Sequence, residues 1–168
     1  MGACALRHVY ALIAAAVAGM VLASCAADLG SAARDERIDA DAIVRLSDTF
    51  AVAARRTPAG AQVVAFVQDG AGGWVAQVVA SGDGAGTTAH LVTMGGETGD
   101  DWNSYLYGTA PDSASRVVVD GFTAVGGQVS NGAWVLAFRQ TDLLPDQLSW
   151  DVVDATGLII ESRVGIAP

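Results

Sequence analysis

Short β-type runs separated by glycine-rich turns constrain this sequence more than any other feature. They recur at intervals of about 8–12 residues, a spacing typical of all-β domains. No long helical pattern lies between them, and a parallel sheet would need crossover helices. The sequence therefore predicts a mainly β fold, an antiparallel sandwich or barrel. The predicted strands are residues 50–54, 62–68, 74–80, 89–94, 104–109, 116–120, 122–130, 133–139, 148–154 and 158–164.

The turns between these runs have residues suited to hairpins. Asn131-Gly132 is a strong two-residue hairpin signal, because both residue types readily adopt positive φ. Residues 69–73 read as a five-residue hairpin loop. The strands on either side of these two turns are therefore expected to pair with each other.

A short helix is expected ahead of the first strand. Ile38, Ala42 and Leu46 recur at helical spacing within residues 34–47, and Ile43 widens the same stripe. The strand region, in turn, carries the series YLYGTAP, RVVV, GAWVLAF and DATGLII, which is similar to immunoglobulin-like modules of secreted bacterial proteins. The resemblance implies an antiparallel β-sandwich, immunoglobulin-like or related, behind a short N-terminal helix.

The N-terminus resembles an export signal with a lipid attachment point. Arg7 precedes an uncharged apolar run of about 13 residues. Leu22-Ala23-Ser24-Cys25 then resembles the lipobox of bacterial lipoproteins: an aliphatic residue, two small residues and a cysteine. The resemblance implies diacylglycerol on the Cys25 thiol and cleavage before Cys25. Ordinary cleavage nearby and an uncleaved membrane anchor are the alternatives.

Other roles for Cys25 have little support in the residues. Cys4 lies inside the expected signal and is removed with it, which leaves Cys25 alone in the mature chain. A lone cysteine makes no intramolecular disulfide and no cysteine-based metal site. We therefore expect a signal peptide over residues 1–24, a small and polar tether over residues 25–36, and a single β-sandwich domain over residues 37–168.

Charge argues against nucleic acid as a partner. The formal net charge is −9, and all nine basic residues are arginines. An acidic surface repels phosphate backbones, and no basic amphipathic face is present that would lie on a membrane. The membrane is expected to be a partner only through the lipid anchor.

No catalytic or metal-binding motif stands out. His90 is the only histidine after the expected signal, and its strand position suits a rim or face residue. The glycines of residues 69–73 and 81–86 read as turns, because phosphate loops need a following helix. Asp100 and Asp101 are weak calcium candidates without a recognised calcium motif, so no metal and no cofactor is expected.

One stretch, residues 100–108, is a candidate ligand site. Trp102, Asn103, Tyr105 and Tyr107 bring three aromatic rings and an amide close together. If Leu106 faces the core, both tyrosines lie on an accessible face beside a polar loop. Such a surface would suit a sugar, a peptide or a protein hot spot. The alternative is that Trp102 closes one end of the sandwich and the tyrosines pack against a neighbouring strand.

We expect a lipid-anchored extracytoplasmic protein, held at the outer leaflet of the cell membrane, that is not an enzyme. It would bind an unidentified protein, peptide or glycan, or support the envelope. A small secreted hydrolase with an unrecognised site and a regulatory partner of a membrane complex are the alternatives. A deep pocket with converging titratable groups would favour the hydrolase, and an exposed apolar patch would favour the binding module.

The anchor prediction is directly testable. A Cys25→Ala variant should lose its lipid modification and be released from the membrane, because two or three acyl chains supply most of the retention. Intact-mass analysis of the membrane-bound protein measures the modification. An unmodified wild-type Cys25 would contradict the prediction.

Overall fold

The protein is mainly β, as predicted, and its strands form antiparallel sheets. The computed structural model describes residues 28–93, 102–139 and 148–165. These residues form one α-helix, a 3₁₀ turn and eleven strands. In chain order they are α1 (Leu29–Asp35), the 3₁₀ turn (Ala40–Ala42), β1 (Val44–Arg45), β2 (Phe50–Arg56), β3 (Gly60–Gln68), β4 (Trp74–Asp83), β5 (His90–Thr93), β6 (Ser104–Thr109), β7 (Ala114–Val119), β8 (Ala124–Gly126), β9 (Ala133–Phe138), β10 (Ser149–Asp154) and β11 (Ile159–Val164).

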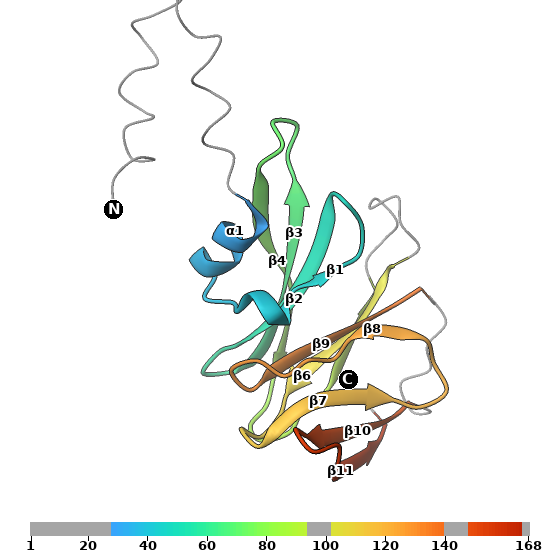
Figure 1. The fold of residues 1–168 in the computed structure, drawn as a ribbon. Coiled ribbons are helices and arrows are strands. Elements are labelled where there is room, and N and C mark those ends of the chain that lie inside the picture. The colour runs from blue at the N-terminus through green and yellow to red at the C-terminus, as the bar shows by residue number, and fades with distance from the viewer. Residues whose placement is uncertain (1–27, 94–101, 140–147, 166–168) are drawn as a thin grey trace, which may run out of the picture.

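The strands form three sheets, which follow one another along the molecule (Figure 1). The N-terminal sheet has the order β1-β2-β3-β4, and the central sheet has the order β5-β6-β9-β8. The C-terminal sheet has the order β11-β10-β7. Every pairing within the three sheets is antiparallel. Six of the eight pairings join consecutive strands, as expected from tight turns, whereas β6 pairs with β9 and β7 pairs with β10.

The central sheet is buried on both faces. Every residue of β6 and of β9 is buried. Side chains alternate along a strand, so Tyr105 and Tyr107 join a core shared with the N-terminal sheet, while Leu106 joins a core shared with the C-terminal sheet. In β9, Val135 and Leu136 divide in the same way. The uninterrupted apolar run of β9 is the pattern expected of a strand without a solvent face.

The N-terminal sheet is covered on its second face by the N-terminal segment. Leu29, Ala32 and Ala33 of α1 pack with Ala51, Ala53, Val64 and Phe66 of β2 and β3. Figure 1 shows α1 beside β3 and β4, whereas β10 and β11 lie at the opposite end of the molecule. The order of layers is therefore helix, N-terminal sheet, central sheet, C-terminal sheet.

The helix was predicted in the wrong place. It begins after Asp28, whose carboxylate accepts a hydrogen bond of 2.8 Å from the Ser31 amide, a typical N-cap. It ends before Arg37, whose φ of 60° lies in the left-handed region and breaks the helix. Ile38 and Ala42 are buried as their spacing suggested, but only Ala42 lies in the 3₁₀ turn.

The expected tether is wrong for the part of it that the structure describes. Residues 29–35 were assigned to a small, polar linker, yet they form α1 and bury Leu29, Ala32 and Ala33. The small residues pack closely on the sheet, because alanine lets a helix approach its neighbour. The domain therefore includes residues 28–36, ahead of the expected boundary at residue 37.

The hairpin signals are confirmed. Asn131 and Gly132 have φ of 50° and 71°, and Ser130 and Ala133 exchange backbone hydrogen bonds across them. In the loop of residues 69–73, the Asp69 carboxylate accepts hydrogen bonds from two backbone amides of the same loop. These turns hold β9 and the β3–β4 pair in register.

Candidate functional site

The aromatic stretch predicted as a ligand site lies in the core. Tyr105 is 0% exposed, Tyr107 3% and Trp102 9%, and all three pack between the N-terminal and central sheets. The Tyr105 hydroxyl donates a hydrogen bond of 2.7 Å to the Trp102 carbonyl. Of the two alternatives, the accessible tyrosine face is therefore wrong and packing of the tyrosines in the core is observed, because Leu106 packs in a second core on the other face of β6.

Of the remaining predicted residues, the structure describes only Asn103. Asn103 is half-buried, and its backbone N–H donates a hydrogen bond of 3.3 Å to the Phe138 carbonyl, which extends the β6–β9 pairing. Cys25, Asp100 and Asp101 lie outside the described residues. Within the described ranges, no group of three or more His, Cys, Asp or Glu side chains is placed to hold a metal ion.

A cavity of about 460 Å³ lies between the N-terminal segment and β2. It is lined by residues 35–39 and 54–58 with Ser130 and Asn131. Its charges are largely satisfied within the protein. Glu36 forms an ion pair with Arg55, and the Asp39 carboxylate accepts hydrogen bonds from Ser130 and Asn131. These contacts hold α1 and the β8–β9 segment on the sheet, which is a structural role.

Another cavity, of about 220 Å³, is the better candidate, and we call it the His90 pocket. It lies where the end of β4, the start of β5, β10 and the end of β11 meet. Two buried polar atoms of its lining residues, Nε2 of His90 and Nε1 of Trp150, have no hydrogen-bond partner among the described residues. Its lining residues are Asp83, Thr87, Thr88, Ala89, His90, Trp150, Arg163, Val164 and Gly165.

His90 is held by two neighbouring strands. It pairs with Tyr107 across the β5–β6 ladder, and the two rings lie 5.6 Å apart between centroids. The imidazole also lies directly on the backbone of Gly82 in β4, so that a Cβ at Gly82 would overlap the ring. Glycine at this position lets the imidazole approach the backbone closely.

Trp150 enters the pocket from the C-terminal sheet. Its indole is 3% exposed and packs against Trp134 of β9 with 5.5 Å between ring centroids. The two indoles differ in their hydrogen bonds. Nε1 of Trp134 donates to the Thr109 carbonyl at 3.2 Å, whereas Nε1 of Trp150 has no partner among the described residues. Buried indole N–H groups ordinarily have a partner.

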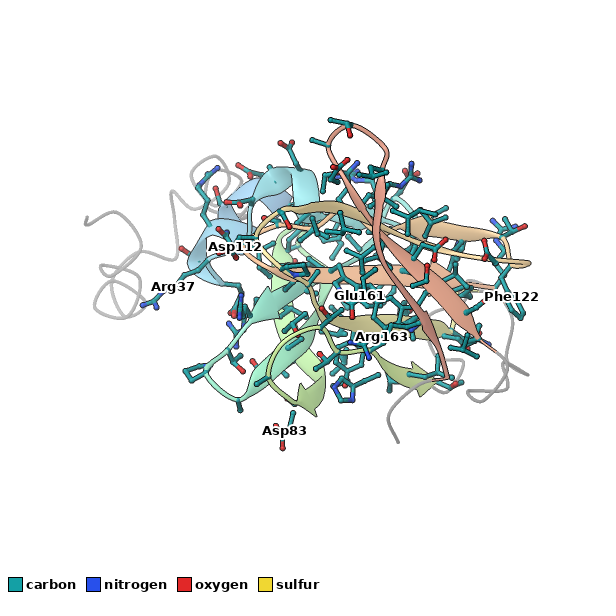
Figure 2. The ribbon with its side chains drawn as sticks, turned by 90° about the horizontal axis from the view of Figure 1, so that it is seen from below. Arg37, Asp83, Asp112, Phe122, Glu161 and Arg163 are labelled. Atoms are coloured by element: carbon teal, nitrogen blue, oxygen red, sulfur yellow. The ribbon has the colours of Figure 1, made fainter. Side chains whose placement is uncertain are left out.

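The rim carries charges of both signs. Figure 2 views this end of the molecule, with Glu161 and Arg163 near the centre and Asp83 at the periphery. The Glu161 carboxylate accepts hydrogen bonds of 2.6 Å from the Thr87 hydroxyl and from Nε of Arg163. The hydrogen bond from Thr87 makes the largest contribution to lowering the pKa of Glu161, and Arg163 lowers it further. Burial, and then the nearby Asp83, raises the pKa of Tyr107.

The pocket is therefore suited to binding a small polar group. An indole N–H donates only, and an imidazole Nε2 donates or accepts according to its tautomer. Asp83 supplies a carboxylate acceptor, whereas the Thr88 hydroxyl is already bonded to Thr109. A bound group that both donates and accepts hydrogen bonds would pair with the indole, the imidazole and the Asp83 carboxylate.

Sequence reasoning missed this site because its residues are far apart in the chain. His90, Trp150 and Arg163 come together only through the stacking of the three sheets. One signal was present: His90 is the single histidine behind the expected signal peptide, and it was assigned to a rim or face position without partners.

Comparison with known proteins adds no relative. No family model matches the chain, and no curated protein and no solved structure matches it either.

The close contact of Gly82 with His90 predicts a steric effect. Gly82→Ala should lower the free energy of unfolding by about 1–3 kcal/mol and displace the imidazole, because the added methyl overlaps the ring. Gly70→Ala is the matched control in the β3–β4 loop, where a Cβ meets nothing within 4 Å, and it should change stability by less than about 0.5 kcal/mol. Denaturant unfolding measures both, and equal stabilities of the two variants would contradict the packing described.

Proposed function

We propose that this protein is a lipid-anchored extracytoplasmic binding module and that its His90 pocket holds a hydroxyl-bearing ligand such as the end of a glycan. One observation carries the choice of site: among the described residues, His90 and Trp150 each have a buried polar atom without a hydrogen-bond partner, and both residues line one cavity. Leaving a buried polar group unpaired costs about 1–3 kcal/mol, so a ligand that pairs with both gains that free energy on binding.

Charge decides between a hydroxyl-bearing ligand and an anion. Asp83 lines the pocket and Glu161 borders it, and only Arg163 opposes them. Arg163 is already paired with Glu161. The carboxylates repel an anion, whereas a hydroxyl donates to a carboxylate and accepts from the indole N–H. Sugars offer several such hydroxyls, and aromatic side chains beside hydrogen-bonding groups suit them.

The proposed anchor would leave the pocket free. Cys25 lies three residues before Asp28, so the lipidated residue would lie within about 11 Å of Asp28. The proposed anchor would then hold α1 towards the membrane. β10 and β11, which line the pocket, lie at the opposite end of the molecule from α1 (Figure 1).

The finer fold assignment, an immunoglobulin-like or related sandwich, stays a prediction. It is supported by the core that the N-terminal and central sheets share.

Over the described residues, no helix has the length and apolar character needed to span a bilayer.

The indole of Trp150 provides a direct test of ligand binding. The chain has four tryptophans, so ¹⁵N-tryptophan labelling gives four indole resonances, and Trp150→Phe identifies the one from the pocket. Methyl glycosides of glucose, galactose and N-acetylglucosamine are the probes. At least one should shift the Trp150 resonance saturably, and His90→Ala should weaken that binding by about tenfold or more.

Trp134 is the internal control, because its N–H is already bonded to Thr109 and its resonance should not move. Acetate is the control for anion binding and should not move the Trp150 resonance. The proposal fails if none of the glycosides shifts Trp150, or if acetate or the Trp134 resonance responds equally.

A further inference from the structure

β11 is an open edge of the C-terminal sheet. Among the described residues it pairs with β10 alone. The other edge strand, β7, is met by the segment after β8, where the Val117 amide donates to the Gly127 carbonyl at 2.7 Å. β11 also exposes apolar side chains on and just before the strand, namely Leu158, Ile159, Ile160 and Val164. An exposed apolar edge of this kind is a template for pairing with another strand.

The hydrogen bonds to β10 show which backbone groups of β11 are open. The Gly165 amide donates to the Leu148 carbonyl at 2.8 Å, so residue 165 points its polar groups towards β10. The direction of the backbone N–H and C=O groups alternates from residue to residue along an antiparallel strand. The backbone groups of Arg163 and Glu161 therefore also point towards β10. The N–H and C=O groups of Ser162 and Val164 point to the open side.

We propose that β11 pairs antiparallel with β11 of a second copy of this chain, with Ser162 on the two-fold axis. The two C-terminal sheets then form one continuous sheet of six strands, three from each copy. The two Ser162 residues exchange both of their outward backbone hydrogen bonds, as an antiparallel hydrogen-bonded pair does.

Charge complementarity selects this register. With Ser162 on the axis, Glu161 lies opposite Arg163 of the second copy, and Arg163 lies opposite Glu161 of the second copy. Centring the pair on residue 161 or 163 would place two like charges directly opposite each other, which is destabilising. The Arg163 side chain is 53% exposed, so guanidinium donors not used by Glu161 of its own chain are available to the second copy.

Apolar contacts extend the pairing on either side. The same register places Ile160 opposite Val164 of the second copy, and both side chains are exposed in the single chain. A β-bulge between β10 and β11 at Ile160 interrupts the ladder beyond Glu161. The pairing is therefore confined to about five residues, from Ile160 to Val164.

The two-fold axis also suits two membrane anchors, a point that rests on the proposed function. The axis relating antiparallel neighbours is perpendicular to their sheet. The layers stack in the same direction, with α1 as the outermost layer on one side. Both copies therefore present α1, and the segment leading to Cys25, to the same side.

A charge exchange tests the pairing itself. Glu161→Arg and Arg163→Glu each place like charges opposite each other, so each variant should dimerise about tenfold or more weakly than the wild-type chain. An equimolar mixture of the two variants should dimerise again, because every cross-strand pair then joins an arginine to a glutamate. Sedimentation equilibrium of the full chain, in a detergent matched in density by the solvent, measures the association. Thermal unfolding checks that both variants are folded.

A cysteine cross-link tests the register independently. Ser162→Cys should form a disulfide-linked dimer in oxidised membranes, since paired residues on adjacent strands have Cα atoms about 5.5 Å apart. Val118→Cys, exposed on β7 of the same sheet, is the matched control and should not cross-link above the wild-type level. Equal cross-linking of the two variants, a monomeric wild-type chain at roughly 100 µM, or a mixture that stays monomeric would overturn the proposal.

These outcomes are separate from the ligand test. The sedimentation mass and the cross-linking test the proposed dimer, whereas the Trp150 resonance tests ligand binding in the His90 pocket. A monomer that binds an extended peptide along β11 would also contradict the pairing of two copies.

Discussion

Burial of β6 and β9 on both faces is the constraint on which the other layers depend, because each face needs a separate apolar cover. The N-terminal sheet covers the face that carries Tyr105 and Val135, and the C-terminal sheet covers the face that carries Leu106 and Leu136. Covering two faces requires two further sheets in one short chain. The N-terminal sheet then has an outer face of its own, which α1 closes with alanines small enough to pack closely.

The His90 pocket is a consequence of this stacking. His90 belongs to the central sheet and Trp150 to the C-terminal sheet, while Gly82 belongs to the N-terminal sheet. The pocket therefore exists only where all three sheets approach one another. Trp134 and Trp150 pack together across two sheets, yet among the described residues only the Trp134 indole donates to a carbonyl. The difference leaves a buried donor at the pocket, and the proposed ligand would satisfy it.

The strands could be predicted from the sequence because their limits are set locally, by glycine turns such as Asn131-Gly132. The position of α1 could not, since it depends on the Asp28 cap and on packing against a sheet formed later in the chain. The sequence left the tyrosines either on an accessible face or packed against a neighbouring strand, because alternation separates the two faces of a strand but does not show whether both are covered. The pocket was missed because Trp150 is distant from His90 in the sequence, and periodicity carries no information about distant contacts.

Native-state amide hydrogen exchange of the full chain tests the central role of β6 and β9 most directly. Their amides, including those of the paired residues Leu106 and Leu136, should exchange only through global unfolding and be the slowest in the protein. The amides of α1 and β1 should exchange at least about tenfold faster, because these elements open locally without uncovering the central sheet. Exchange in β6 and β9 as fast as in α1 would contradict the account.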